Sequence, residues 1–220
     1  MPFDVHKARE DFPILSRVIN NKPLVYLDSG ASAQKPNAVI DAMSHAMRHS
    51  YANVHRGLHT LANETTDAYE AGRDTVAKFI GAQTDEIIFT KSATESINLV
   101  ANTWGESLAA GDEILITEME HHANIVPWYM LAQRKGIKLV YAPILDDGSL
   151  DMVAFDQLLT PKVKLVAITH MSNVLGTINP IADIIAKAHS IGAKVLIDGC
   201  QGVVHLPVDV KALNLSLIHI

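Results

Sequence analysis

The 220-residue sequence is 48% hydrophobic and 19% charged, with a formal net charge of −6 at neutral pH. This composition is typical of a globular domain with a sizeable core, and no basic stripe of the kind that binds nucleic acid is visible. No apolar run reaches membrane-spanning length, and the first residues lack a secretory or transit pattern. Because Cys200 is the single cysteine, an internal disulfide is excluded, and we expect a cytoplasmic protein.

In chain order, the sequence predicts a short helix and an arm within the first 22 residues, followed by helices and strands that alternate. Short apolar runs rich in β-branched residues predict strands at 86–90, 113–117, 138–142, 164–169, 194–197 and 215–220. Helical patterns predict helices at 36–50, 60–80, 93–104, 125–135, 151–159 and 180–190. Strands that alternate with helices of this length indicate crossover connections. The predicted fold is therefore α/β, with a mostly parallel sheet and helices on both faces.

The helix expected after the strand at 86–90 has a start that suits an anion. The hydroxyls of Ser92 and Thr94, together with the free N–H groups of a helix N-terminus, would form a cradle for a phosphate group. The alternative is a plain capping box, because Glu95 follows Ser92 at the required spacing. The sequence has neither a Walker GxxxxGK loop nor a GxGxxG loop, so a nicotinamide-binding Rossmann domain is disfavoured.

Two adjacent histidines, His121 and His122, follow the strand at 113–117. Metal binding is one interpretation, but the helical His-Glu-x-x-His spacing of zinc sites and a cysteine pair are both missing. A histidine at a strand end can instead stack on a flat aromatic ligand while its nitrogens handle protons. The simplest alternative is one buried and one exposed histidine that take no part in a site.

Polar residues also follow two later strands, those at 164–169 and 194–197. Asn173, after the strand at 164–169, could offer its amide to a ligand oxygen or act only as a turn-former. Asp198 comes directly after the buried strand at 194–197, with Gln201 close behind, and it could be a site residue or a cap of the next turn. Ligands of open α/β sheets bind at the carboxyl ends of the strands, which favours a site there.

Four successive strand ends thus carry complementary groups: hydroxyls at a helix start, a histidine, an amide, and a carboxylate with a second amide. Pyridoxal phosphate (PLP) needs such a set, namely an anion cradle, a group that stacks on its ring, donors to its ring oxygen, and a carboxylate that keeps its ring nitrogen protonated. Each signal is weak by itself, but their ordered recurrence on consecutive strands favours PLP as the cofactor.

Six segments of the sequence resemble one known family. They are residues 27–36 (LDSGASAQKP), 54–61 (VHRGLHTL), 93–100 (ATESINLV), 119–128 (MEHHANIVPW), 169–176 (THMSNVLG) and 195–201 (VLIDGCQ). The family is that of the SufS-type cysteine desulfurases, which belong to the class V aminotransferases, a family of fold-type I PLP enzymes. The resemblance covers roughly residues 8 to 214 and implies the N-terminal half of such a protein.

The resemblance implies a role for each matching residue. It implies that the cofactor-binding residues are Ala93, Thr94, His121, Asn173, Asp198 and Gln201. Ala93 and Thr94 would bind the phosphate, and His121 would stack on the ring and act as a catalytic proton-transfer group. Asp198 would pair with the ring nitrogen. Asn173 and Gln201 would contact the ring oxygen, Asn173 also reaching the substrate carboxylate.

The resemblance also implies sites outside the cofactor pocket. His55 and Arg56 match a family motif near the active-site mouth and the dimer contact. Cys200 stands where the family usually has a small residue, so it is interpreted as an apolar filler and not as the nucleophilic cysteine. We expect no metal site.

The sequence departs from the family pattern at its end. The family has a Ser-x-His-Lys segment about two dozen residues after the aspartate, and its lysine forms the Schiff base. Residues 215–220 instead read Leu-Ser-Leu-Ile-His-Ile, which resembles foreign or out-of-frame sequence. We therefore expect an N-terminal helix and arm at residues 1–22 and a truncated large domain at residues 23–220. The C-terminal small domain and the nucleophilic cysteine of the family's mobile loop are both expected to be absent.

Three functions remain open from the sequence. The resemblance implies that the intact protein is a cysteine desulfurase that removes sulfur from L-cysteine, leaves L-alanine, and supplies an enzyme persulfide to iron–sulfur cluster assembly. Its partners would be a second copy in a homodimer and a sulfur-acceptor protein, with no nucleic acid and no membrane. Selenocysteine lyase, acting on L-selenocysteine, is the alternative chemistry. The chain of 220 residues alone would be a non-catalytic fragment.

Overall fold

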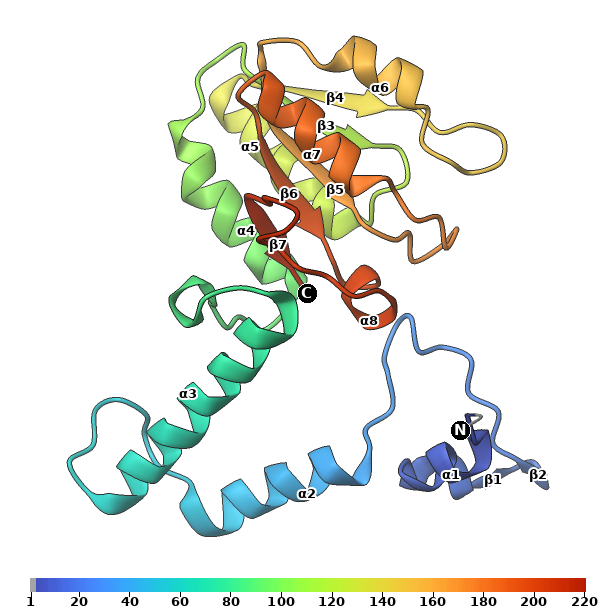
Figure 1. The fold of residues 1–220 in the computed structure, drawn as a ribbon, viewed down its shortest axis with the longest axis vertical. Helices are drawn as coiled ribbons and strands as arrows, with labels where there is room; N and C mark the ends of the chain where they lie inside the picture. Colours follow the sequence, from blue (N-terminus) through green and yellow to red (C-terminus); the bar gives the residue numbers. More distant parts are fainter. Residues whose placement is uncertain (1–2) are drawn as a thin grey trace. The chain divides into compact units, whose positions relative to one another are not determined.

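The computed structural model describes residues 3–220, which form two compact units (Figure 1). The first unit ends at Asp74 and the second begins at Thr75. Helix α3 (Thr60–Ile80) begins in the first unit and ends in the second, and its bounds are those predicted from the sequence. Among residues 3–220, no helix has both the length and the apolar character that a membrane crossing requires.

The first unit contains the short helix and arm that the sequence predicts. Helix α1 (Val5–Glu10) begins at Asp4, whose Oδ1 accepts hydrogen bonds from two N–H groups of the first turn. The turn η1 (Pro13–Ser16) follows, and strands β1 (Val18–Ile19) and β2 (Lys22–Pro23) pair antiparallel. The expected extension of the large domain back to residue 23 stays a prediction.

The helix expected at 36–50 is present in two pieces. Helix α2 (Asn37–His45) is regular, and it continues into η2 (Ala46–Ser50), one turn of π-helix. None of the α2 side chains is buried, and Met43 and Met47 are largely exposed.

The second unit is built on a five-stranded sheet in the order β4-β3-β5-β6-β7. The strands are β3 (Glu113–Thr117), β4 (Lys138–Ala142), β5 (Val163–Thr169), β6 (Lys194–Asp198) and β7 (Leu217–His219). Every neighbouring pair is parallel, so all five carboxyl ends lie at one edge. The predicted parallel sheet and five of its predicted strands are confirmed.

Helices cover both faces of this sheet because successive strand residues point to opposite sides. On one face, Leu115 and Val166 pack with buried residues of α6 (Met152–Leu158) and α7 (Ile181–Ser190). On the other face, Ile114 and Leu165 pack with buried residues of α4 (Ala93–Asn102) and α5 (Val126–Lys135). These two cores hold the sheet in place and fix the positions of the strand ends.

The strand predicted at 86–90 is wrong. Residues 84–86 form the 3-10 turn η3 (Thr84–Glu86), and the apolar residues that follow belong to no strand of the part of the chain that the structure describes. A cavity of about 860 Å³ is lined by both this segment and β7. Ile88 and Phe89 therefore remain exposed instead of joining the sheet.

Candidate active site

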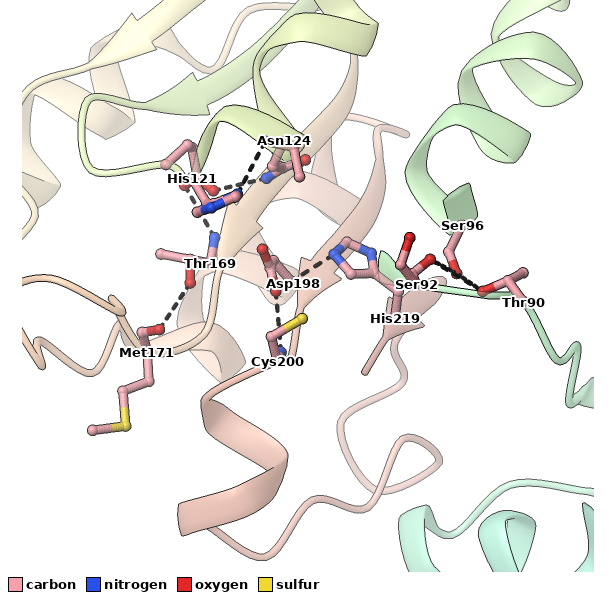
Figure 2. Close-up of polar contacts among 12 residues, drawn as sticks. Thr90, Ser92, Ser96, His121, Asn124, Thr169, Met171, Asp198, Cys200 and His219 are labelled. Carbon is pink, nitrogen blue, oxygen red and sulfur yellow. Dashed lines mark hydrogen bonds and ion pairs between the residues drawn. The ribbon is translucent and has the colours of Figure 1, made fainter. Parts of the chain in front are cut away.

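The carboxyl ends of β3, β5 and β6 lie side by side at one edge of the sheet (Figure 2). The last residues of β5 and β6, Thr169 and Asp198, are Cα partners in the parallel ladder, and β3 lies on the other side of β5. Parallel strands place their ends together in this way without any further interaction. The prediction that strand ends share one edge is confirmed for β3, β5 and β6, whereas residues 86–90, the first of the four expected strands, form no strand.

Asp198 is a buried carboxylate at this edge, with 6% of its surface exposed. Its Oδ1 accepts a hydrogen bond from the Cys200 N–H at 3.0 Å and lies 3.5 Å from Nε2 of His219 on β7. Burial alone would raise the pKa of Asp198, but the His219 ring and the Cys200 N–H outweigh burial and lower it. Asp198 is therefore ionised at neutral pH.

The second oxygen of Asp198 points away from these two contacts, toward the side where His121 and Thr169 lie (Figure 2). The hydrogen bond from the Cys200 N–H and the contact with His219 both fall on Oδ1, and the Cys200 thiol also interacts with the carboxylate. A buried, ionised carboxylate with one oxygen directed at a strand-end site is a receptor for a cationic N–H donor.

His121 occupies the turn that follows β3. It is the N-cap of the short turn η5 (His122–Asn124), and its Nδ1 accepts a hydrogen bond from the Ala123 N–H at 3.1 Å. A neutral ring that accepts at Nδ1 carries its proton on Nε2. The simplest alternative from the sequence, one buried and one exposed histidine, is wrong, because both rings are exposed.

Glu120 is a residue of this edge that the sequence analysis missed. Its carboxyl group is buried and accepts three hydrogen bonds, from the Thr117 hydroxyl at 2.6 Å, the Asn124 amide at 2.7 Å and the Thr169 N–H at 3.0 Å. Burial raises the pKa of Glu120 to about 7, and the three donors oppose that rise. The sequence signal was an acid directly before His121, but only the fold shows that this acid is enclosed.

Helix α4 begins close to the same edge and packs against η5 and β7. Ser92 is its N-cap, and the Ser92 hydroxyl accepts the Glu95 N–H at 3.2 Å, so the capping alternative holds for this residue. Ala93 and Thr94 form the first turn, whose N–H groups lack partners within the helix. Thr94 is exposed, and the predicted phosphate contact stays a prediction.

Asn173 and Gln201 lie in the loops after β5 and β6. Asn173 is exposed in a tight turn that the Gly176 N–H closes on the Ser172 carbonyl at 3.0 Å, so its side chain has no buried structural role. Gln201 is half-buried and is the N-cap residue of α8 (Gly202–His205). The predicted ligand contacts of both amides stay predictions.

His55 and Arg56 lie in the first unit. His55 has a left-handed backbone with φ of 64°, and its Nε2 lies 3.2 Å from Glu70 Oε1 on α3. Its ring also meets the ring of Tyr69 edge to face. These contacts give His55 a local structural role, and the proposed roles at the active-site mouth and the dimer contact stay predictions.

Cys200 is not an activated nucleophile in this fold. Burial, followed by the negative charge of Asp198, raises the pKa of its thiol to about 12. At pH 8 we therefore expect alkylation by iodoacetamide to be at least tenfold slower in the folded chain than in the chain unfolded in guanidinium. The rate follows from mass spectrometry of the single cysteine, and equal rates would contradict a protonated, enclosed thiol.

The groups at this edge fit PLP. A cationic ring nitrogen would supply a donor to the oxygen of Asp198 that points toward His121. His121 lies in the turn after β3, and the first turn of α4 would offer N–H groups to an anion. The fold and this edge together define a PLP-binding α/β protein. Three comparisons with known proteins agree with that class.

Residues 25–220 match the aminotransferase class-V family, and the chain belongs to that family, whose members depend on PLP. A cysteine desulfurase of Enterobacter sp. (strain 638) is 56% identical over 216 residues, which cover 97% of this chain and 53% of the relative. A cysteine desulfurase of Cronobacter sakazakii is 55% identical with the same coverage. The chain thus spans about half the length of the curated relatives it matches.

Solved structures give the same result. The apo cysteine desulfurase from Thermococcus onnurineus NA1 has a TM-score of 0.91 and 37% identity, covering 99% of this chain and 53% of that one. The cysteine desulfurase CsdA (S-sulfonic acid) from Escherichia coli has a TM-score of 0.85 and 39% identity, covering 99% and 54%. The fold is therefore that of these PLP-dependent enzymes over the length they share.

Proposed function

We propose that this chain is the cofactor-binding half of a cysteine desulfurase that releases sulfur from L-cysteine and leaves L-alanine. The observation that carries the proposal is the buried, ionised Asp198 at the end of β6, with one oxygen directed to the side of His121. The desulfurase relatives at 55–56% identity support the reaction class. L-Selenocysteine is the alternative substrate.

Bound PLP supplies a ring that withdraws electrons from the substrate amino acid. The residues of this chain would bind and orient that ring. Asp198 would accept the ring N–H and hold its positive charge, while the first turn of α4, at Ala93 and Thr94, would bind the phosphate. His121 would stack on the ring and, with the proton on Nε2 and an exposed edge, could transfer protons at the substrate.

The same proposal extends to the remaining predicted groups. Asn173 and Gln201 would donate hydrogen bonds to the ring oxygen, and Asn173 would also contact the substrate carboxylate. His55 and Arg56 would contribute to the active-site mouth of a homodimer. A sulfur-acceptor protein of iron–sulfur cluster assembly would receive the sulfur, and the protein would work in the cytoplasm.

A chimera tests this function directly. Residues 1–214 of this chain would be joined to the remaining half of the Enterobacter relative. We expect the chimera to form alanine and sulfide in equal amounts from L-cysteine in the presence of a reductant, and an Asp198→Ala chimera to form neither. The 220-residue chain assayed alone is expected to be inactive.

The outcomes separate the alternatives. A chimera that binds PLP but uses only L-selenocysteine would support the lyase and contradict the desulfurase. A folded chimera that neither binds PLP nor forms alanine would contradict both. Alanine formation by the 220-residue chain, above that of its Asp198→Ala variant, would contradict the expectation that it is non-catalytic.

A further inference from the structure

The turn that carries His121 is closed by a buried network of hydrogen bonds. The Asn124 N–H donates to the His121 carbonyl at 2.8 Å. The Asn124 side chain donates to Glu120 Oε2 at 2.7 Å and accepts the Trp128 indole N–H at 2.9 Å. Asn124 and Trp128 are fully buried, so the network links the turn to the core beneath α5.

Glu120 joins this turn to two strands of the sheet. Its Oε1 accepts the hydroxyl of Thr117, the last residue of β3, and the N–H of Thr169, the last residue of β5. One carboxyl group therefore bridges the ends of adjacent strands and the turn from which the next residue, His121, projects. None of these partners is a charged group, so the bridge depends on hydrogen bonds alone.

We propose that Glu120 is a positioning residue, which in its ionised form holds His121 in the place from which it stacks on the cofactor ring. The inference rests on the proposed function, because it takes from it the role of His121. Glu120 itself contacts neither cofactor nor substrate in this proposal. It acts through the geometry of the turn.

The ionised form is the one that the partners fit. Thr117, Asn124 and Thr169 all direct N–H or O–H groups at the carboxylate, which can accept from all of them at once. A proton on Glu120 would need an acceptor. The Asn124 oxygen is already taken by Trp128, and the Thr169 N–H can only donate. Only the Thr117 hydroxyl can reverse to accept this proton, and its own proton then no longer has Glu120 as an acceptor.

Glu120 gains or loses its proton in the physiological pH range. The pKa of Glu120 is about 7, raised chiefly by burial and, to a smaller extent, by the negative charge of Asp198 on β6. Asp198 is the charged group from the neighbouring strands that acts on Glu120, and the exposed His121 ring is the next titratable group along the chain. As the pH rises through 7, Glu120 loses its proton and the turn gains its full set of hydrogen bonds.

The experiment measures binding of pyridoxamine 5′-phosphate, which has no aldehyde and so cannot react with surface lysines. Affinity is followed by quenching of tryptophan fluorescence from pH 6 to pH 8.5, for the 220-residue chain and its Glu120→Gln variant. We expect the variant to bind about tenfold more weakly at pH 8, where it lacks the ionised acceptor. The ratio of the two affinities should fall toward one below pH 6, with a midpoint near 7.

Two further variants make the result specific. Glu118→Gln removes an exposed carboxylate from the same turn, and its affinity ratio to the unmodified chain should stay near one at every pH. Thr117→Val removes one hydrogen-bond donor to the ionised carboxylate and so raises the pKa of Glu120. The pH at which the affinity of this variant changes should therefore move to a higher value. Because Thr117→Val keeps the carboxylate, it tests the inference even if Glu120→Gln does not fold.

The outcomes distinguish this inference from the proposed function. If the unmodified chain does not bind pyridoxamine 5′-phosphate at all, the proposed cofactor site is wrong, and the inference falls with it. If the chain binds but Glu120→Gln binds equally well, only the inference is overturned. A loss that is the same at every pH would indicate a purely structural residue and would also overturn it.

Discussion

Replacement of Asp198 by alanine should weaken binding of pyridoxamine 5′-phosphate about a hundredfold, equivalent to about 3 kcal/mol. The loss follows from the removal of a buried, ionised acceptor at the end of β6, whose pKa is held low by His219 and Cys200 in spite of burial. Fluorescence titration of the 220-residue chain measures the affinity. The largest loss is expected near neutral pH, where the aspartate is charged.

The Asp198→Asn variant separates the effect of the negative charge from the effect of the side chain's shape. The asparagine can still accept the Cys200 N–H, so the loop after β6 should keep its conformation, but its neutral amide cannot balance a cationic ring nitrogen. It should therefore lose nearly as much affinity as the alanine variant. Asp156→Asn, which removes an exposed carboxylate paired with Lys187 on α7, should bind as the unmodified chain does. Binding within twofold of normal by a folded Asp198→Ala variant would refute the assignment.

The largest loss of stability is expected for Trp128→Ala, at about 3–5 kcal/mol in the free energy of unfolding. Trp128 is fully buried between α5 and the sheet, and its indole N–H satisfies the buried Asn124 oxygen. The variant would leave both a cavity and an unpaired acceptor. Urea denaturation followed by circular dichroism measures the change.

Two further variants show how much of the loss of stability comes from the hydrogen bond and how much from packing. Trp128→Phe fills most of the space but lacks the N–H, so the part it loses reports the hydrogen bond to Asn124. Tyr129→Ala, on the exposed face of the same helix, should change the stability by no more than about 0.5 kcal/mol. If Trp128→Ala were no more harmful than Tyr129→Ala, the packing of α5 described above would be wrong.

Much of the fold could be predicted because most strands and helices are specified by the pattern of apolar residues within their own segment. Apolar runs at 113–117 and 194–197 predict strands, and their β-branched residues suit a sheet buried on both faces. The run at 86–90 has the same composition but forms no strand. A strand needs a partner edge, and nothing in the residues 86–90 themselves specifies whether an edge lies within reach.

The candidate site was predictable only in part, for the same reason. Asp198 ends β6 and His121 lies in the turn that follows β3, so the parallel topology places both at one edge. Glu120 could not be identified, because its three donors come from positions 117, 124 and 169, and only the folded sheet brings the last of these close. His219 was equally hidden, since its pairing with Asp198 depends on the register of β6 and β7.

The parallel order of the sheet also determines when the site forms during folding. Parallel neighbours are joined by crossovers, so β3 pairs with a strand that begins 50 residues after its own start, between Glu113 and Val163. Contacts at such separations form late in folding, because the intervening chain must first be brought together. The edge that holds Glu120, His121 and Asp198 is therefore complete only when β6 has docked. We therefore expect the chain to fold before it binds the cofactor, because a chain in which β6 has not yet paired lacks the assembled site.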